Sequence, residues 1–316
     1  MKGRDGSLAS SADHCAREPK VLLENMKSIL NISLVLVLAA LSAANSLASE
    51  SSPRLKELRH ESTVLGREMG IRVLLPAGYE VGTRRFPTLI LLHGLGGDFK
   101  NWADKTELVA RTERLGLIIV MPDGGDGWYT DSASDPKQAV ESYLITEVIP
   151  FVDSRFRTIA SKDSRFVAGL SMGGYGALKF GLKYPGLFSV AGSFSGALDA
   201  PLRGEGNAFL RPSITRVFGG PDNERRKTDE IFALLDTISV DASRILPYLY
   251  IDCGTEDWLI ETNRKFAERL LSKKIPHEFR QLPGRHDWKF WNSQIVEFLR
   301  LLVNRGAVAE APASSL

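Results

Sequence analysis

The stretch GLSMGGYGAL, at residues 169–178, decides how this 316-residue sequence is interpreted. The apolar run 165–168 before it has the composition of a β-strand, and residues 177–184 are predicted as a helix that ends before Pro185. A serine in the pattern G-x-S-x-G, between a strand and a helix, is typical of a nucleophile elbow. We therefore interpret Ser171 as a nucleophile. The alternative is a glycine-rich turn in which this serine has no chemical role.

The composition favours a soluble globular protein, with 43% hydrophobic and 25% charged residues. A net charge of +2, without a basic run or a basic stripe with interleaved aromatics, argues against nucleic-acid binding. Five histidines without a Cys/His cluster give no zinc-site spacing, so we expect neither a metal nor an organic cofactor. Cys253 is the only cysteine after residue 48, so no internal disulfide is expected in a processed chain.

The N-terminal region is predicted to carry a secretion signal at 26–48. Met26 and Lys27 precede an apolar run at 29–44, and small residues follow up to Ala48, where we expect cleavage. The run is short of the ~20 residues that span a bilayer, although an uncleaved anchor is the alternative. Residues 1–25 are interpreted as an over-extended N-terminus. The protein is then secreted or periplasmic, with no stable membrane association after cleavage.

Strands and helices alternate along the rest of the chain. Apolar runs predict strands at 70–75, 88–92, 116–121, 165–168, 187–195, 247–252 and 277–282, and periodic stretches predict helices at 101–115, 139–151, 177–184, 263–272 and 292–303. This alternation predicts an α/β fold with a mostly parallel, doubly wound sheet and helices on both faces.

One α/β domain is expected at 70–305. A lead-in segment, 49–69, precedes it, and a flexible tail, 306–316, follows it. Residues 199–243 interrupt the alternation and are predicted to form a small cap insertion over the pocket; a simple surface excursion is the alternative.

A serine nucleophile needs a base, and the base needs a carboxylate to orient it. His286 directly follows the last predicted strand and alone fits the chain order Ser…acid…His comfortably. Asp257, just beyond the strand at 247–252, is the favoured acid because the loop has turned by then. Glu256 and Asp252 remain alternatives, and either could instead cap the following helix.

The negative charge that forms during attack needs backbone N–H donors. Met172, the residue after the serine, supplies one. The second should come from the glycine-rich loop 93–97, whose backbone can approach a ligand closely.

Four motifs carry a resemblance to a known family: LHGLGG at 92–97, GLSMGGYGA at 169–177, GTED at 254–257 and GRHDW at 284–288. They resemble the Putative esterase family of α/β-hydrolases, which includes tributyrin esterases, S-formylglutathione hydrolases, feruloyl and acetyl-xylan esterases and the mycolyltransferase antigens. The resemblance runs from about residue 70 to residue 302. It implies an α/β-hydrolase fold, with Ser171 as nucleophile, Asp257 as acid, His286 as base, and oxyanion N–H groups from Leu95 and Met172.

The substrate pocket is expected to include His93, Gly94, Trp128 and Tyr129, and the resemblance implies that residues 122–125, Trp128 and Tyr129 lie near its mouth. The two aromatic rings could stack on a sugar or phenolic ring, or could equally belong to the core.

The expected function is that of a secreted serine carboxylesterase acting on small-molecule or carbohydrate esters through an acyl-enzyme. The alternatives are an acyltransferase of the mycolyltransferase type, an S-formylglutathione hydrolase, and a non-catalytic binding protein on a hydrolase fold. The sequence leaves the oligomeric state open.

Overall fold

The computed structural model describes residues 52–205, 208 and 210–311. The chain divides into two units, 1–52 and 53–316, and the description below concerns the second. The predicted over-extended N-terminus, the signal peptide and the proposed cleavage after Ala48 lie outside the described residues.

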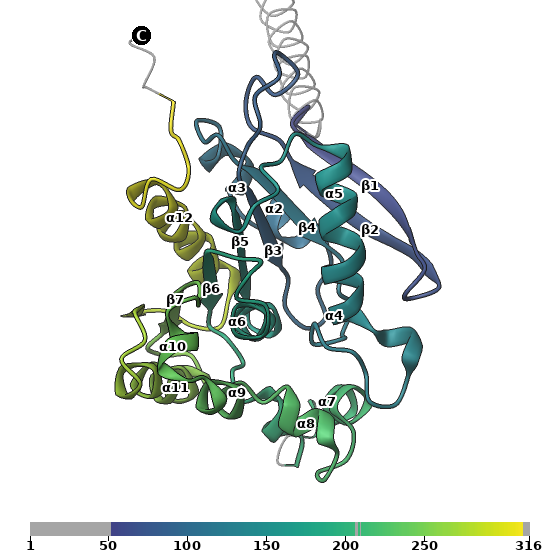
Figure 1. Cartoon of the computed structure of the whole chain (residues 1–316), viewed down its shortest axis with the longest axis vertical. Coiled ribbons are helices and arrows are strands. Elements are labelled where there is room, and N and C mark those ends of the chain that lie inside the picture. Colours follow the sequence, from purple (N-terminus) through teal and green to yellow (C-terminus); the bar gives the residue numbers. More distant parts are fainter. Residues whose placement is uncertain (1–51, 206–207, 209, 312–316) are drawn as a thin grey trace, which may run out of the picture. The chain divides into compact units, whose positions relative to one another are not determined.

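Eight strands of the described chain form a single sheet (Figure 1). They are β1 (Leu55–Ser62), β2 (Arg67–Leu74), β3 (Thr88–Leu92), β4 (Ile118–Pro122), β5 (Arg165–Leu170), β6 (Val190–Phe194), β7 (Tyr248–Gly254) and β8 (His277–Leu282). Their order across the sheet is β1-β2-β4-β3-β5-β6-β7-β8. Strands from β4 to β8 run parallel, whereas β1 and β2 add two antiparallel strands at one edge.

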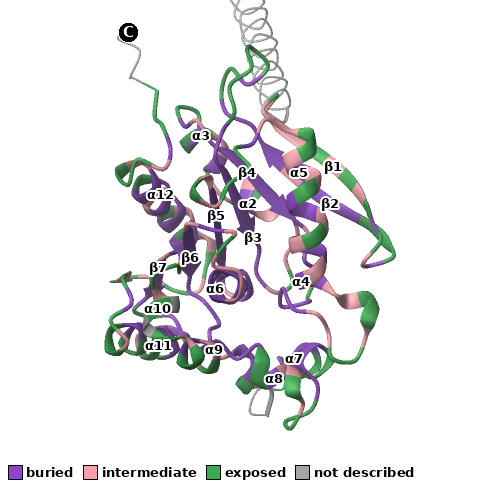
Figure 2. Cartoon of the chain, viewed as in Figure 1, coloured by how far each residue is buried: buried purple, intermediate pink, exposed green. Residues whose placement is uncertain are grey.

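The centre of the sheet is buried on both faces. In β3, Leu89 and Leu91 pack into one hydrophobic cluster, and Ile90 and Leu92 pack into another. Alternate side chains of a strand point to opposite faces, so a continuous apolar run is what a strand covered on both sides needs. Figure 2 shows the contrast with β1, whose residues alternate between intermediate and exposed positions.

Helices cover the two faces of the sheet. The described helices are α2 (Asn101–Lys105), α3 (Leu108–Arg111), α4 (Val140–Ser142), α5 (Ile149–Arg155), α6 (Met172–Lys183), α7 (Arg211–Phe218), α8 (Glu224–Thr228), α9 (Ile231–Thr237), α10 (Val240–Ser243), α11 (Ile260–Ser272) and α12 (Trp288–Asn304). Helix α6 packs Tyr175 and Leu178 into the cluster of Ile90, whereas α12 packs Ile295 and Phe298 into the cluster of Leu89. The predicted doubly wound α/β fold is confirmed.

Two predicted helices differ from the structure. The helix predicted at 101–115 is broken into α2 and α3, because Thr106 is extended and its Oγ1 accepts the Leu108 N–H. The helix predicted at 139–151 extends to Arg155 and contains a π-helical stretch, Tyr143–Val148, between α4 and α5.

Both ends of the predicted α/β domain need correction. The boundary at 70 falls inside β2, since the lead-in segment contains β1, which pairs with β2 over eight residues. Residues 306–311, predicted as part of a flexible tail, are held by backbone hydrogen bonds. Gly116 N–H donates to the Ala309 carbonyl, and Ala311 N–H donates to the Arg114 carbonyl.

The insertion at 199–243 contains a short 3₁₀ turn (Ala200–Glu205) and α7 to α10. Figure 1 shows α7, α8 and α9 gathered below α6. Hydrogen bonds fix the insertion to the fold; among them, the Tyr175 hydroxyl donates to the Asp229 carbonyl, and Lys183 donates to the Asp229 carboxylate. The insertion is therefore a packed part of the domain.

The tight strand-to-helix turn predicts which glycines cannot be replaced. A Cβ on Gly173 would lie 2.6 Å from the Leu92 carbonyl oxygen, whereas a Cβ on Gly186 would meet nothing within 4 Å. Gly173→Ala should reduce the free energy of unfolding by about 1–3 kcal/mol, because the backbone of β3 must move. Gly186→Ala, the matched control, should change it by less than about 0.5 kcal/mol. Urea denaturation of both variants measures this, and equal stabilities would contradict it.

Candidate active site

Ser171 occupies a strained turn between β5 and α6. Its φ of 53° and ψ of −113° lie outside the regions that non-glycine residues normally adopt. Three backbone hydrogen bonds hold it: its N–H donates to the Phe194 carbonyl, and its carbonyl accepts from Tyr175 and Ala197. This is the geometry that G-x-S-x-G between a strand and a helix predicts.

The structure brings Ser171, Asp257 and His286 together. His286 lies on the loop between β8 and α12, with Nε2 3.0 Å from the Ser171 Oγ. Its Nδ1 lies 2.8 Å from Asp257 Oδ2. The imidazole can therefore accept the serine proton at one nitrogen while the carboxylate holds the other.

Asp257 is a buried carboxylate on the loop between β7 and α11. Burial alone would raise its pKa, but the hydrogen bond and charge of His286 and the Leu259 N–H, which donates to Oδ1, lower the pKa below its usual range. The carboxylate is thus ionised across the neutral pH range, as a residue that orients a histidine must be.

The two alternative acids lie in other environments. Glu256 is exposed and pairs with Arg285 at 2.9 Å. Asp252 is fully buried, and burial raises its pKa well above the usual range. Among the described contacts, neither carboxylate pairs with His286.

The loop after β3 is fixed by hydrogen bonds to the loop that follows β4. His93 is 1% exposed, and its Nε2 accepts the Gly124 N–H at 2.9 Å. Gly96 N–H donates to Asp126 at 2.8 Å. A Cβ on Gly94 would lie 2.6 Å from the end of the Leu170 side chain, so glycine lets this loop lie against the serine turn without moving that side chain.

A cavity of about 180 Å³ opens between this loop and the serine. It is lined by Gly94, Leu95, Gly96, Gly97, Asn101, Lys105, Leu170, Ser171, His286, Trp288 and Trp291. Leu95, one predicted oxyanion residue, is in this lining, and Met172, the other, begins α6 directly after the serine. The start of a helix is where backbone N–H groups lack intrahelical acceptors.

A sequence model of the family described as Putative esterase matches residues 62–302. The chain belongs to this family. It is 35% identical over 262 residues to an esterase of Mycobacterium tuberculosis (strain H37Rv), covering 75% of this chain but only 57% of that relative. It is 30% identical over 223 residues to an acetyl esterase of Caldicellulosiruptor saccharolyticus, covering 68% of this chain and 83% of that enzyme.

Among solved structures, the chain resembles FphF, a fluorophosphonate-binding serine hydrolase of Staphylococcus aureus, with a TM-score of 0.71 and 28% identity. The match covers 79% of this chain and 98% of FphF. Together with the sheet order, these comparisons confirm the α/β-hydrolase fold.

Three residues predicted to line the substrate pocket lie in the core instead. The Trp128 and Tyr129 side chains are 1% and 0% exposed, so neither ring can stack on a substrate. The Trp128 indole N–H donates to the Ser213 hydroxyl on α7, and the Tyr129 hydroxyl donates to the His93 carbonyl. His93 is equally buried, and of the four predicted pocket residues Gly94 alone is in the lining of the cavity beside Ser171.

A buried ion cluster holds the 122–135 loop against α6. The Lys179 ammonium is fully buried and donates to the Tyr129 carbonyl, the Thr130 hydroxyl and the Glu141 carboxylate. Burial favours the neutral acid, but the charges and hydrogen bonds of Lys179 and Lys183 outweigh it and lower the pKa of Glu141 to about 2.

The sequence interpretation missed two aromatic residues beside His286. Trp291 on α12 meets the imidazole edge to face, with ring centroids 4.9 Å apart. The Trp258 ring lies 5.3 Å from it and is 53% exposed. Trp258 directly follows the predicted acid, Asp257, and this adjacency was the sequence signal that could have identified it.

Two kinds of feature are absent from the part of the chain that the structure describes. No group of three or more histidine, cysteine, aspartate or glutamate residues there could hold a metal ion. No helix within that part has the length and apolar character needed to cross a membrane.

The contacts of His286 predict which acidic residue is needed for activity. Asp257→Asn should lower kcat for p-nitrophenyl acetate by roughly 10³–10⁴-fold, because the amide cannot stabilise the imidazolium. Glu256→Gln, an exposed control on the same loop, should stay within about twofold of wild type, since its partner is Arg285. Steady-state kinetics, with circular dichroism to check folding, compare these variants with Asp252→Asn. A larger loss in a folded Asp252→Asn variant would contradict the assignment.

Proposed function

We propose that this protein is a serine carboxylesterase that acts through an acyl-enzyme formed on Ser171. The observation that carries the proposal is the chain of contacts from the Ser171 hydroxyl through His286 to Asp257, at the edge of a cavity. Membership of an esterase family, and similarity to proteins named esterase, acetyl esterase and serine hydrolase, support it.

In the first half-reaction, His286 Nε2 takes the Ser171 proton while Oγ attacks the ester carbonyl carbon. The carbonyl oxygen becomes an oxyanion, which the Leu95 and Met172 N–H groups would stabilise. The carbonyl then re-forms, and the bond to the alcohol oxygen breaks. His286 gives its proton to that oxygen, so the alcohol leaves and the acyl group stays on Ser171.

In the second half-reaction, a water molecule takes the place of the alcohol. His286 accepts one water proton as the hydroxyl attacks the acyl-enzyme, and returns it to Ser171 Oγ as the carboxylic acid leaves. All proton transfers use the same imidazole nitrogen. Asp257 keeps the other nitrogen protonated and stabilises the positive ring.

We further propose that the enzyme works outside the cytoplasm. The support comes from the charged segment that begins at Met26, the apolar run at 29–44 and the small residues up to Ala48. After expression of the full chain in a secreting host, N-terminal sequencing of protein recovered from the medium or periplasm should give a start near Ser49. An intact N-terminus on cytosolic protein would contradict secretion. A membrane-bound product that retains the apolar run would indicate an anchor.

The nucleophile assignment has a chemical test. Ser171→Ala should lower kcat for p-nitrophenyl acetate by about 10³-fold or more, and the Ser171→Ala/His286→Ala double variant should be scarcely slower, because the two groups act as a unit. A fluorophosphonate should add covalently to the wild-type peptide that contains Ser171 and not to the serine variant. Activity of the Ser171→Ala variant above about a tenth of wild type would overturn the proposal.

A further inference from the structure

The cavity beside Ser171 contains one lysine, Lys105, at the end of α2. Apart from His286, it is the only titratable side chain in the cavity lining. Its ammonium lies 5.2 Å from the centre of the Trp288 ring, which lines the same cavity. A cation thus stands next to an aromatic face inside the space that contains the serine and the histidine.

The charge of Lys105 has no carboxylate partner within ion-pair distance among the described residues. The two nearest acids in the sequence are bound elsewhere: Asp104 pairs with Arg72, and Glu107 pairs with Arg111. Asp126 accepts the Gly96 N–H, is not part of the cavity lining and forms no ion pair with Lys105 among the described residues. The lysine is therefore available to an anion that enters the cavity.

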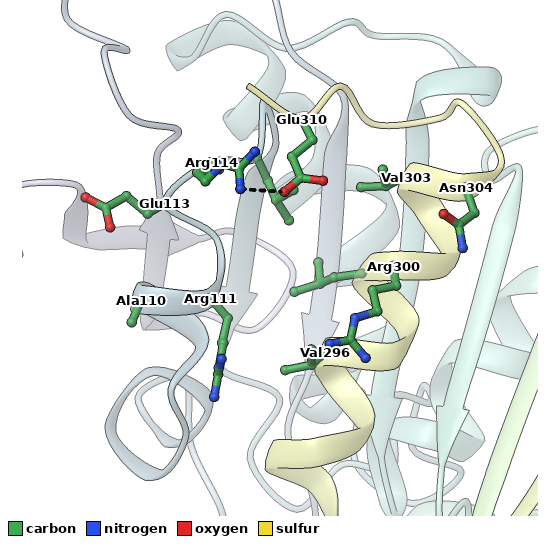
Figure 3. A pocket seen from close by; sticks show the side chains of 11 residues that line it. Ala110, Arg111, Glu113, Arg114, Val296, Arg300, Val303, Asn304 and Glu310 are labelled. Atoms are coloured by element: carbon green, nitrogen blue, oxygen red, sulfur yellow. Dashed lines mark ion pairs between the residues drawn. The ribbon is translucent and has the colours of Figure 1, made fainter. Parts of the chain in front are cut away.

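In a larger hollow elsewhere, the cationic side chains are already paired with carboxylates. It has a volume of about 500 Å³ and lies between α3, α12 and the segment at Glu310 (Figure 3). Each of its arginines is paired: Arg111 with Glu107, Arg114 with Glu310, and Arg300 with Glu297. An anion there would have to displace an existing carboxylate, whereas at Lys105 it would not.

The wall of the cavity indicates which part of an ester meets Lys105. The leaving oxygen must reach His286 Nε2 to receive its proton. From the imidazole, the wall continues through Trp291, 4.9 Å away, and Trp288, 5.2 Å further, to the ammonium. An alcohol bound along these two rings would end at the lysine.

We propose that the site prefers esters whose alcohol part carries a carboxylate, that is, acyl esters of hydroxy acids. Lys105 would bind the carboxylate and Trp288 would contact the carbon skeleton between it and the ester. The cavity is small, about 180 Å³, which suits a short or flat hydroxy acid. This inference rests on the proposed esterase function and adds the class of alcohol.

The test compares 4-acetoxybenzoate with its neutral methyl ester, by acetate release. Lys105→Met should lower kcat/KM for the anionic ester relative to the neutral one by up to about fivefold, mainly through KM, because an exposed ion pair contributes modestly. Lys105→Arg should restore the ratio. The wild-type preference for the anion should shrink at about 1 M salt, where screening is strong.

Lys100→Met is the matched control. Lys100 is half-buried and also lies over an aromatic ring, Phe99 at 5.3 Å, but it pairs with Glu57 and lies outside the cavity lining. Its replacement should leave the ratio of the two esters unchanged. An equal change in Lys100→Met and Lys105→Met would overturn the inference in favour of a general surface-charge effect.

Two further outcomes distinguish a failure of this inference from a failure of the proposed esterase function. If Ser171→Ala abolishes hydrolysis of both esters while Lys105→Met leaves their ratio unchanged, the carboxylate site is wrong and the esterase stands. If Ser171→Ala retains activity, the esterase proposal itself fails. A second pair of esters carries the charge on the acyl part: 4-methylumbelliferyl hydrogen adipate and its methyl ester. If Lys105→Met changes the kcat/KM ratio of this pair only, the assignment of the cavity to the alcohol part is wrong.

Discussion

The backbone conformation of Ser171 is the constraint on which the rest of the site depends. A non-glycine residue in such a conformation costs roughly 1–3 kcal/mol, which the surrounding structure must supply. Here three backbone hydrogen bonds supply it, together with close packing of β3 against the start of α6. That packing is possible only because Gly173 has no side chain. The exposed hydroxyl is therefore a consequence of how tightly one strand, one turn and one helix meet.

Sheet topology then brings the other two groups to the serine. β5, β6, β7 and β8 are neighbours and run parallel, so their carboxyl ends meet at one edge. Ser171, Asp257 and His286 each follow one of these strands. Parallel pairing converts the separations of 115 residues between Ser171 and His286, and of 29 residues between Asp257 and His286, into two hydrogen-bond distances. The buried carboxylate keeps its charge because His286 stands against it, so orientation and ionisation depend on the same contact.

Much of this could be predicted from the sequence, because the decisive patterns are local. Continuous apolar runs indicated strands buried on both faces, and G-x-S-x-G fixed the turn; the roles of the three site residues remain predictions. Features set by tertiary contacts were not predictable. For Trp128 and Tyr129 the sequence left a place in the pocket and a place in the core equally open. Contacts with residues distant in sequence decide for the core: Trp128 donates to Ser213, and Lys179 donates to the Tyr129 carbonyl. The break at Thr106 was hidden because a side-chain hydroxyl, not a glycine or proline, ends α2.

The same distinction explains why the reaction is easier to infer than the substrate. The frame around the three site residues is held by close or buried contacts: the elbow glycines, the His93 hydrogen bond and the Lys179–Glu141 pair. Replacing any of these costs stability, because a tight contact is lost or a buried charge is left unpaired. Two exposed side chains carry no such penalty: Lys105 in the cavity lining and Trp258 beside His286. Substrate choice can therefore change through a few exposed residues near the serine while the buried frame stays the same, and those residues follow no motif.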